Sequence, residues 1–191
     1  WRDQEYTYDA WGNLIEKRSG MNRLQTFSYD CENRLVKAET LVGGKLESTG
    51  AYRYDSLGRR VAKVSEVNGV TEQKHFLWQG LRMLREETPG QSSLYIYEPG
   101  SYAPLARVDQ EEGGEQTLYY FHTDQIGTPL EMTDREGQIV WQATYKAWGA
   151  VERLDVNAVE QNLRFQGQYF DDETGLHYNT FRYYDPEVGR F

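Results

Sequence analysis

The stretch Tyr54-Asp55-Ser56-Leu57-Gly58-Arg59 contains the pattern that decides the fold. Two earlier stretches repeat it: Tyr8-Asp9-Ala10-Trp11-Gly12-Asn13 and Tyr29-Asp30-Cys31-Glu32-Asn33-Arg34. An Asp side chain can accept a hydrogen bond from the backbone two residues further on, and Gly or Asn at the fourth position tolerates a positive φ. Such turns commonly connect two antiparallel strands. Each copy is therefore predicted to be the tip of a β-hairpin.

The same spacing returns without the preceding Tyr at Asp124, Asp134 and Asp172. A short local device that recurs in this way is typical of repeat architectures and not of a single catalytic fold. The residues predicted to form these structural turns are Asp9, Gly12, Asp30, Asn33, Asp55, Gly58, Asp124, Gly127, Asp134, Gly137, Asp172 and Gly175.

Composition favours strands and argues against two classes of surface. The 191 residues include 15 Tyr, 5 Trp and 7 Phe, which are strand-forming residues. The net charge of −9 argues against a nucleic-acid surface and is interpreted mainly as a solubility feature, with a docking face for a basic partner as the alternative. No apolar stretch has the length of a membrane span. Because Cys31 is the only cysteine, a disulfide framework is excluded and synthesis in a reducing cytoplasm is compatible with the sequence.

Along the chain we distinguish three segments: residues 1–64 with the close repeats, residues 65–115 with less regular spacing, and residues 116–191. Alternation and turn dipeptides predict strands throughout, and only Val156–Gln161 has a pattern that could be helical. The predicted strands after residue 64 are Lys74–Trp78, Met83–Glu87, Leu94–Tyr97, Leu105–Val108, Leu118–His122, Leu130–Thr133 and Ile139–Tyr145. The fold class is therefore predicted to be all-β.

Three Tyr-Asp repeats in a row resemble the YD repeats of Rhs proteins. The second half of the chain is similar to the Rhs repeat-associated core, whose start and end are matched by separate stretches. These stretches are His122-Thr123-Asp124-Gln125-Ile126-Gly127-Thr128-Pro129, Tyr145-Lys146-Ala147-Trp148-Gly149, the run from Leu163 to Asn179, Arg182-Tyr183-Tyr184-Asp185-Pro186 and Gly189-Arg190-Phe191.

This resemblance implies a fold and a function. In bacterial Rhs toxins, many of them type VI secretion effectors, antiparallel hairpins form a curved sheet that closes into a hollow β-cocoon around a C-terminal toxin domain. The implied partners are the protein's own toxin domain, the remaining shell segments, a secretion spike and a chaperone. The implied route is synthesis in the bacterial cytoplasm, then secretion and delivery to target cells in interbacterial competition. In the family an Asp-Pro-Gly-type self-cleavage motif follows the Gly-Arg-Phe run. Since the sequence stops at Phe191, no catalytic residue is assigned and the chain is expected not to be an enzyme.

Several residues suggest chemistry but are predicted to be structural. The His122-Thr123-Asp124 run has the residue types of a catalytic dyad, although Asp124 is already predicted to form a turn. Asp171-Asp172-Glu173 offers carboxylates to a hard cation but lacks the spacing of a calcium loop, so a solvated turn tip is predicted there. Asp185-Pro186 is predicted to be a turn, and the three His residues are too scattered for a zinc site. No cofactor or metal is predicted.

Two other functions remain open at this point. The aromatic stretches Tyr119–Phe121 and Tyr169-Phe170 are predicted to be cross-strand ladders, with a sugar-stacking platform as the alternative. An extracellular adhesion or carbohydrate-binding module is therefore one rival to the shell. Part of a self-cleaving aspartyl protease region is the other.

Overall fold

The computed structural model describes residues 4–165 and 167–191. Trp1 and Gln166, which lies in the C-terminal motif, therefore fall outside the described residues. Two compact units make up the chain. Unit 1 consists of Trp1–Lys74 and Asp172–Gly175, and unit 2 consists of His75–Asp171 and Leu176–Phe191. The short segment Asp172–Gly175 thus belongs to unit 1 although both of its flanking strands belong to unit 2.

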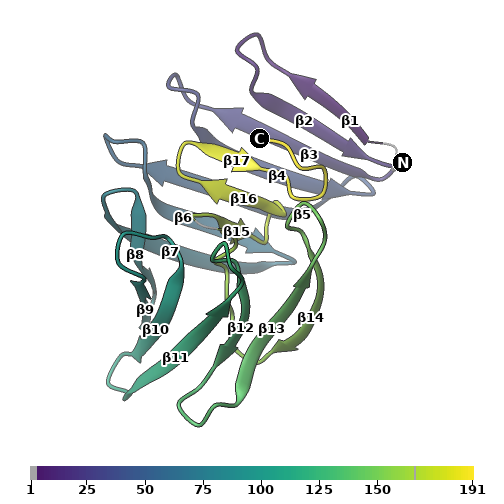
Figure 1. The fold of residues 1–191 in the computed structure, drawn as a ribbon. Helices are drawn as coiled ribbons and strands as arrows, with labels where there is room; N and C mark the ends of the chain where they lie inside the picture. Colours follow the sequence, from purple (N-terminus) through teal and green to yellow (C-terminus); the bar gives the residue numbers. More distant parts are fainter. Residues whose placement is uncertain (1–3, 166) are drawn as a thin grey trace. The chain divides into compact units, whose positions relative to one another are not determined.

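Unit 1 is built from successive hairpins (Figure 1). Its strands are β1 (Gln4–Tyr8), β2 (Leu14–Ser19), β3 (Arg23–Tyr29), β4 (Leu35–Val42), β5 (Lys45–Tyr54), β6 (Arg60–Val67) and the first half of β7 (Val70–Gln79).

Unit 2 continues the same pattern and adds a short C-terminal meander. Its strands after β7 are β8 (Arg82–Thr88), β9 (Gln91–Tyr97), β10 (Pro104–Glu111), β11 (Gln116–Thr123), β12 (Pro129–Thr133), β13 (Ile139–Tyr145), β14 (Val151–Asn157), β15 (Tyr169–Asp171), β16 (Leu176–Asn179) and β17 (Arg182–Tyr184).

Strands β1 to β14 form one 14-stranded sheet in which every strand pairs with its neighbour in the sequence. Strands β15 to β17 form a separate antiparallel sheet in the same sequential order. In the large sheet β1 and β14 are the two edges, so the described strands do not close the sheet. The prediction of an all-β fold of antiparallel hairpins is confirmed.

One helix that the sequence pattern allowed does not form. The segment Val156–Gln161, predicted to allow a short helix, begins as the end of β14 and continues without regular structure. Pairing across strands decides this, because Val156 lies opposite Gln142 and Asn157 lies opposite Trp141. The backbone N–H of Ala158 then donates to the carbonyl of Val140, so strand-like bonding extends beyond the strand. Among the described residues no helix is long and apolar enough to cross a membrane.

The Asp turns impose a repeated irregularity on the sheet. The strand register shifts between Thr7 and Tyr8, between Ser28 and Tyr29, and between Arg53 and Tyr54. In each case the fourth turn residue is in the left-handed region, with a φ of 88° at Gly12, 59° at Asn33 and 77° at Gly58. A type I turn followed by a left-handed residue produces such a bulge.

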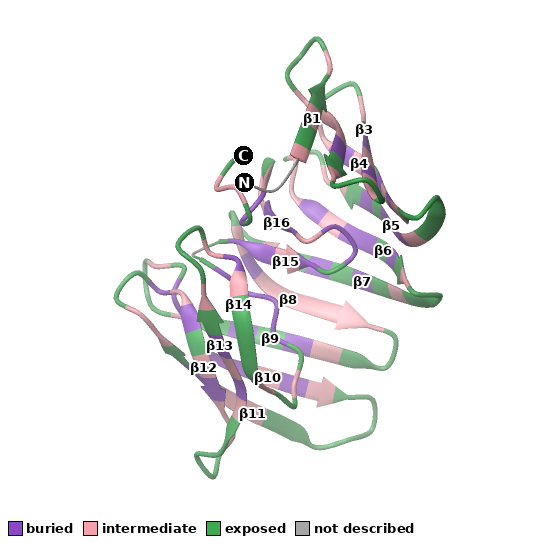
Figure 2. Ribbon diagram, turned by 90° about the vertical axis from the view of Figure 1, so that its right-hand side faces the viewer, coloured by how far each residue is buried: buried purple, intermediate pink, exposed green. Residues whose placement is uncertain are grey.

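Burial alternates along the strands, which makes one face of each unit its core (Figure 2). In β9 the side chains of Ser93 and Tyr95 are buried while those of Leu94 and Ile96 are exposed. The buried face is unusually polar. It carries four basic residues that are less than one-tenth exposed on β2, β6 and β7, namely Lys17, Arg60, Lys63 and Lys74. Buried polar and charged groups require partners, and in unit 1 a partner for this face is the segment Asp172–Gly175.

Candidate functional site

Five of the predicted Asp turns share one hydrogen-bond pattern. The Asp55 Oδ1 atom accepts from the backbone N–H groups of Leu57 at 2.9 Å and Arg59 at 3.0 Å. The backbone N–H of Gly58 donates to the Asp55 carbonyl, and the N–H of Asp55 donates to the Arg59 carbonyl. The turns that begin at Asp9, Asp30, Asp124 and Asp134 repeat these bonds with the same geometry.

These bonds stabilise the ionised carboxylates of the turns. At Asp30, burial by itself would raise the pKa, but hydrogen bonds from the Arg34 backbone, the Arg34 side chain and the Glu32 backbone lower it below the ordinary value. The pKa of Asp55 is lowered for the same reasons, with Arg59 and Leu57 as donors. The turn carboxylates therefore serve as hydrogen-bond acceptors for backbone N–H groups.

Side chains also connect one turn to the next in unit 1. The Asn13 side-chain amide donates to Asp9 Oδ2 within its own turn and to Asn33 Oδ1 of the next turn, at 2.8 Å. The Arg34 guanidinium in turn donates to the Asp55 carbonyl at 3.5 Å and lies over the Tyr54 ring. Neighbouring hairpin tips are therefore bonded to each other as well as through the sheet.

The Tyr that precedes Asp in two of the turns, at Tyr29 and Tyr54, has a role that the sequence argument missed. The Tyr29 hydroxyl at the end of β3 donates to the carbonyl of Leu14, the first residue of β2, at 3.0 Å. The Tyr54 hydroxyl at the end of β5 donates to the carbonyl of Leu35, the first residue of β4, at 2.7 Å. We call this bond the tyrosine tie. The signal that could have identified it is the fixed position of Tyr directly before Asp.

The tyrosine tie recurs in unit 2 where the Asp is absent. Tyr97 precedes Glu98 and donates to the Met83 carbonyl at 2.7 Å, and Tyr145 precedes Lys146 and donates to the Pro129 carbonyl at 2.8 Å. Burial raises the pKa of Tyr145 to about 12, opposed by the positive charge of Arg164. The tie is therefore a property of the Tyr position, independent of the Asp beside it.

The C-terminal hairpin ends in a buried polar site. Glu173, at its tip, is 2% exposed, and its carboxylate accepts from Lys63 Nζ and from the Tyr52 hydroxyl, both at 2.8 Å. Its backbone carbonyl accepts from the hydroxyls of Ser48 at 2.6 Å and Thr40 at 3.3 Å. Strands β4, β5 and β6 therefore each contribute to one receptor for the hairpin tip.

Two neighbouring contacts complete the receptor. The Gln25 side-chain amide on β3 donates to the Thr174 carbonyl at 2.9 Å. Gly50 leaves room for the site, because a Cβ atom there would lie 2.4 Å from the Tyr52 hydroxyl and 3.0 Å from Glu173 Cγ.

The predicted solvated turn at Asp171-Asp172-Glu173 is therefore wrong for two of its three residues. Asp171 is fully buried and Glu173 is nearly so, while only Asp172 is exposed. Gly175 has the expected positive φ of 74°. The Asp172 side chain, however, makes no hydrogen bond to a described residue, unlike the first residue of the other five turns. In this sixth turn the side-chain contacts are made by Glu173 and not by Asp172. The reason is that Lys63, 110 positions earlier, supplies a buried counter-charge that local sequence cannot reveal.

The base of the hairpin is anchored inside unit 2. Glu86 accepts hydrogen bonds from the hydroxyls of Tyr95 at 2.8 Å and Tyr169 at 2.6 Å. Burial first, and then the charge of Glu86, raise the pKa values of both tyrosines well above their ordinary value. His177 on β16 is also buried, and its Nδ1 atom lies 2.8 Å from Gln168 Oε1. Burial, and then the positive charge of Arg164, lower the pKa of His177 to about 3.

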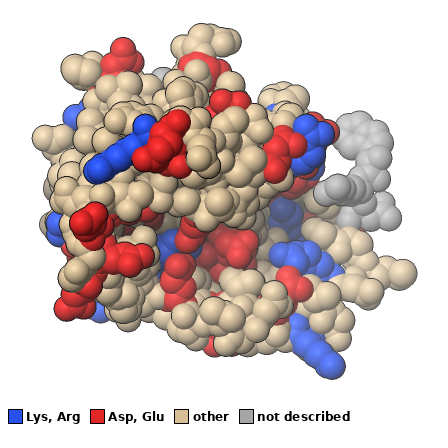
Figure 3. Space-filling model, turned by 90° about the horizontal axis from the view of Figure 1, so that it is seen from below, with Lys and Arg blue, Asp and Glu red and all other residues tan. Residues whose placement is uncertain are grey.

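The remaining candidate residues occupy structural positions. His122 is exposed and bonds to Thr133 on the next strand, so it does not act on Asp124. Asp185 closes a turn by accepting from the backbone of Val188 and Gly189, and Cys31 is exposed. Within residues 4–165 and 167–191, no three His, Cys, Asp or Glu side chains form a group that could hold a metal ion. One face carries acidic and basic side chains close to one another (Figure 3).

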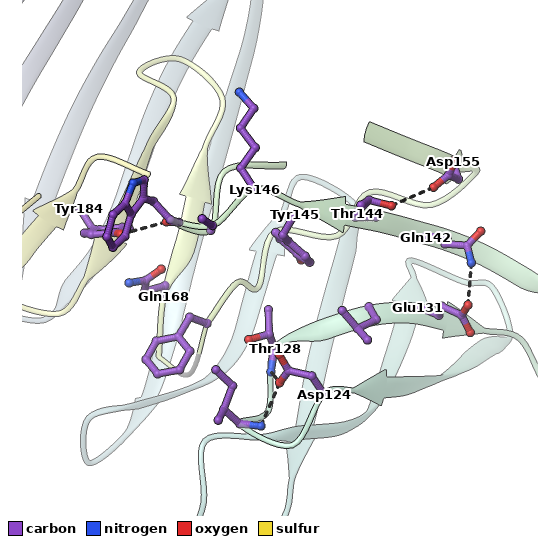
Figure 4. Close-up of a pocket in the computed structure, with 17 residues that line it drawn as sticks. Asp124, Thr128, Glu131, Gln142, Thr144, Tyr145, Lys146, Asp155, Gln168 and Tyr184 are labelled. Carbon is purple, nitrogen blue, oxygen red and sulfur yellow. Dashed lines mark hydrogen bonds between the residues drawn. The ribbon is translucent and has the colours of Figure 1, made fainter. Parts of the chain in front are cut away.

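Unit 2 also contains an open pocket of about 650 Å³ (Figure 4). Its walls are the Asp124–Thr128 turn, strands β12 and β13, the turn from Lys146 to Gly149, and side chains of the C-terminal segment. The polar residues labelled in the figure are bonded mainly to each other or to backbone, as in the pairs Gln142–Glu131 and Thr144–Asp155.

Comparisons with known proteins place these features in a family context. Residues 118–155 match the family model described as RHS protein. The double-stranded DNA deaminase toxin A of Burkholderia cenocepacia is 43% identical over 100% of this chain, and the toxin protein Tse5 of Pseudomonas aeruginosa is 37% identical over 97% of it. The chain spans only 15% and 16% of the length of these relatives.

A solved structure shows the same fold. The Photorhabdus luminescens Tc holotoxin pore matches 97% of this chain with a TM-score of 0.65 and 21% sequence identity. The chain corresponds to 11% of the matched chain in that structure. The two chains therefore share a fold over nearly the whole length of the smaller one.

Proposed function

Because the chain belongs to the Rhs family of YD-repeat proteins, we propose that it is a segment of a shell that encloses a C-terminal toxin domain. In this proposal residues 1–64 are YD repeats, residues 65–115 are less regular shell strands, and residues 116–191 are the repeat-associated core. The function is containment, since a continuous sheet separates a toxic cargo from the cell that makes it. The twelve turn residues from Asp9 to Gly175 named above serve the shell by shaping its hairpin tips.

The observation that carries this proposal is the tyrosine tie. It bonds the end of one hairpin strand to the start of the preceding strand in both units, at Tyr29, Tyr54, Tyr97 and Tyr145. Each added hairpin thereby bonds to a backbone carbonyl at the equivalent position of the hairpin before it. Such a nearest-neighbour rule supports extension of the sheet by further copies.

The killing chemistry is assigned to a region outside this chain. The relatives are named as toxins, one of them a DNA deaminase, and the chain matches only 15% to 16% of their length. The Asp carboxylates of five turns accept backbone hydrogen bonds and the Glu173 carboxylate pairs with Lys63, which supports a structural role for these groups. We further propose that the whole protein is made in the bacterial cytoplasm and delivered to competitors by type VI secretion, with a spike protein and a chaperone as partners.

The test is electron microscopy of the full-length protein combined with intact-mass measurement. We expect a hollow particle that retains its C-terminal domain and protects it from added protease. A solid or extended particle with a protease-sensitive C-terminal domain would contradict containment and favour an adhesion module. A glycan-binding assay on the same sample distinguishes those two functions.

A further inference from the structure

The pocket in unit 2 has exposed apolar walls that the fold itself does not require. Ile126 and Trp148 are at turn tips and are 48% and 61% exposed, and Phe165 is 44% exposed. Leu130 on β12 adds a fourth partly exposed apolar side chain to the same cavity. A cavity of about 650 Å³ lies within the range of ligand pockets, and clustered exposed apolar groups mark interaction sites.

The charged residues of this pocket are mostly acidic. Asp124, Glu131 and Asp155 line it, and Lys146 is its basic residue. Both carboxylate oxygens of Glu187 lie close to Lys146 Nζ, at 3.1 and 3.2 Å. In Figure 4 the Lys146 side chain extends away from Asp124 and Glu131. The pocket therefore repels anions and attracts cations.

Two of the acidic residues lack a basic partner. Asp155 pairs with Arg153, whereas Asp124 and Glu131 form no ion pair with any Lys or Arg of the described chain. Asp124 accepts backbone bonds from Ile126 and Thr128 through one oxygen, Oδ1. Glu131 accepts from the neutral Gln142 side chain at 2.6 Å. Each carboxylate thus has acceptor capacity left for a cationic donor.

From this combination we propose that the unit 2 pocket binds a basic polypeptide segment, in which an Arg or Lys side chain stands next to an apolar one. The cation pairs with Glu131 and Asp124, and the apolar neighbour packs against Ile126, Leu130 and Phe165. The exposed indole of Trp148 provides a face for cation–π contact. This inference goes beyond containment, because it assigns a specific recognition site to the pocket of unit 2.

The direct test is isothermal titration calorimetry of the 191-residue protein with the blocked peptide acetyl-Leu-Arg-Leu-amide. Its counterpart, in which citrulline replaces Arg, has nearly the same shape and no charge. We expect saturable binding of the Arg peptide that weakens as salt is added, and binding of the citrulline peptide that is weaker by roughly tenfold or more. Equal affinities for the two peptides would overturn the role of charge. No saturable heat up to about 1 mM peptide would overturn the site itself.

Variants localise the binding. Glu131→Gln keeps the shape and the acceptor for Gln142 but removes the charge, and it is expected to weaken the Arg peptide by roughly tenfold without affecting the citrulline peptide. Ile126→Ala is expected to weaken both peptides. The matched control is Glu152→Gln on β14, an exposed carboxylate outside the pocket, which should leave both affinities unchanged. If Glu152→Gln acts as strongly as Glu131→Gln, the effect is one of net charge and the proposal fails.

This outcome is separable from that of the shell proposal. Peptide binding is measured on this chain alone, while containment is measured on the particle formed by the full-length protein. A hollow particle without peptide binding would contradict only the recognition-site proposal. Peptide binding without a hollow particle would contradict only the shell proposal.

Discussion

A single hydroxyl group distinguishes the Tyr-Asp motif from an ordinary hairpin turn. The Asp carboxylate satisfies the backbone of its own turn, whereas the Tyr hydroxyl bonds to the strand of the preceding hairpin. The first contact is local and the second joins separate hairpins. At the residue scale the motif therefore combines a turn with a connection.

Removal of the tie hydroxyl should destabilise the sheet by a modest amount. Tyr54→Phe keeps the ring under Arg34 but leaves the Leu35 carbonyl without its donor, so we expect a loss of about 1 kcal/mol in the free energy of unfolding. Urea denaturation measures it. Tyr102→Phe is the control, because the Tyr102 hydroxyl bonds to no described residue, and it should change stability by no more than a few tenths of a kcal/mol, roughly. Equal effects of the two changes would contradict the tie.

The buried pair of Glu173 and Lys63 should be sensitive to loss of either partner. Glu173→Gln removes the carboxylate that pairs with the buried Lys63 ammonium, and a loss of about 3–5 kcal/mol is expected. Lys63→Met combined with Glu173→Gln should recover much of this loss, since neither member of the pair then carries a charge. A double-mutant cycle by urea denaturation measures the coupling. The exposed pair Lys37–Glu39 is the control, with an expected coupling below about 1 kcal/mol.

At the scale of elements, the hairpin tips depend on one backbone conformation. Gly58 has a φ of 77°, and Asn33 occupies the equivalent position with a φ of 59°. Gly58→Val should therefore cost at least about 1–2 kcal/mol, because β-branched residues resist positive φ, and Gly58→Asn should cost less. Gly127→Val, at a φ of 83°, should behave like Gly58→Val. Thermal denaturation measures these differences in stability. Equal melting temperatures for the Val and Asn variants would contradict the assignment of a left-handed conformation to Gly58.

The C-terminal hairpin should lose stability in acid because of His177. Its pKa is lowered from 6.5 to about 3 by burial, so below pH 6.5 the unfolded chain takes up the proton before the folded chain does. The stabilisation is complete above pH 6.5 and is lost as the pH falls toward 3. This single group accounts for about 2 kcal/mol of loss at pH 5.

His177→Phe should flatten the pH dependence of stability between about pH 7 and pH 5, even though the loss of the Gln168 bond lowers stability overall. His122→Gln, at an exposed position, should leave the pH dependence as it is. A pH dependence in His177→Phe that equals the wild-type one would show that other groups dominate.

For the whole molecule, five buried or half-buried tyrosines predict alkaline unfolding. Burial raises the pKa values of Tyr29, Tyr95, Tyr97, Tyr145 and Tyr169 above the ordinary value of 10. Above pH 10 the unfolded chain releases these protons first, so stability is full below pH 10 and falls as the pH rises through the folded-state values. Tyrosinate absorbance and circular dichroism should show the buried tyrosines ionising together with loss of the sheet. Complete ionisation of all tyrosines near pH 10 in a folded protein would contradict their burial.

The sequence by itself determined the parts of this protein that depend on neighbours along the chain. Gly58 and Asn33 predict positive φ, Asp55 predicts a bonded turn, and alternation predicts the strands on either side. The helix that the pattern of Val156–Gln161 allowed does not form, because Val156 pairs with Gln142 across the sheet. The family assignment also came from linear motifs, which need no knowledge of distant contacts.

Only the tertiary structure decided which polar groups are buried and with whom. The linear sequence predicts that Glu173 is a solvated turn residue, yet it lies against Lys63 and Tyr52 on strands far earlier in the chain. The same holds for the Tyr54 hydroxyl and the His177 ring. Their roles depend on hydrogen-bond partners and neighbours that only folding brings close to them. Burial makes an ion pair or a hydrogen bond strong and its loss costly, and burial is set by packing between segments that the sequence does not place side by side.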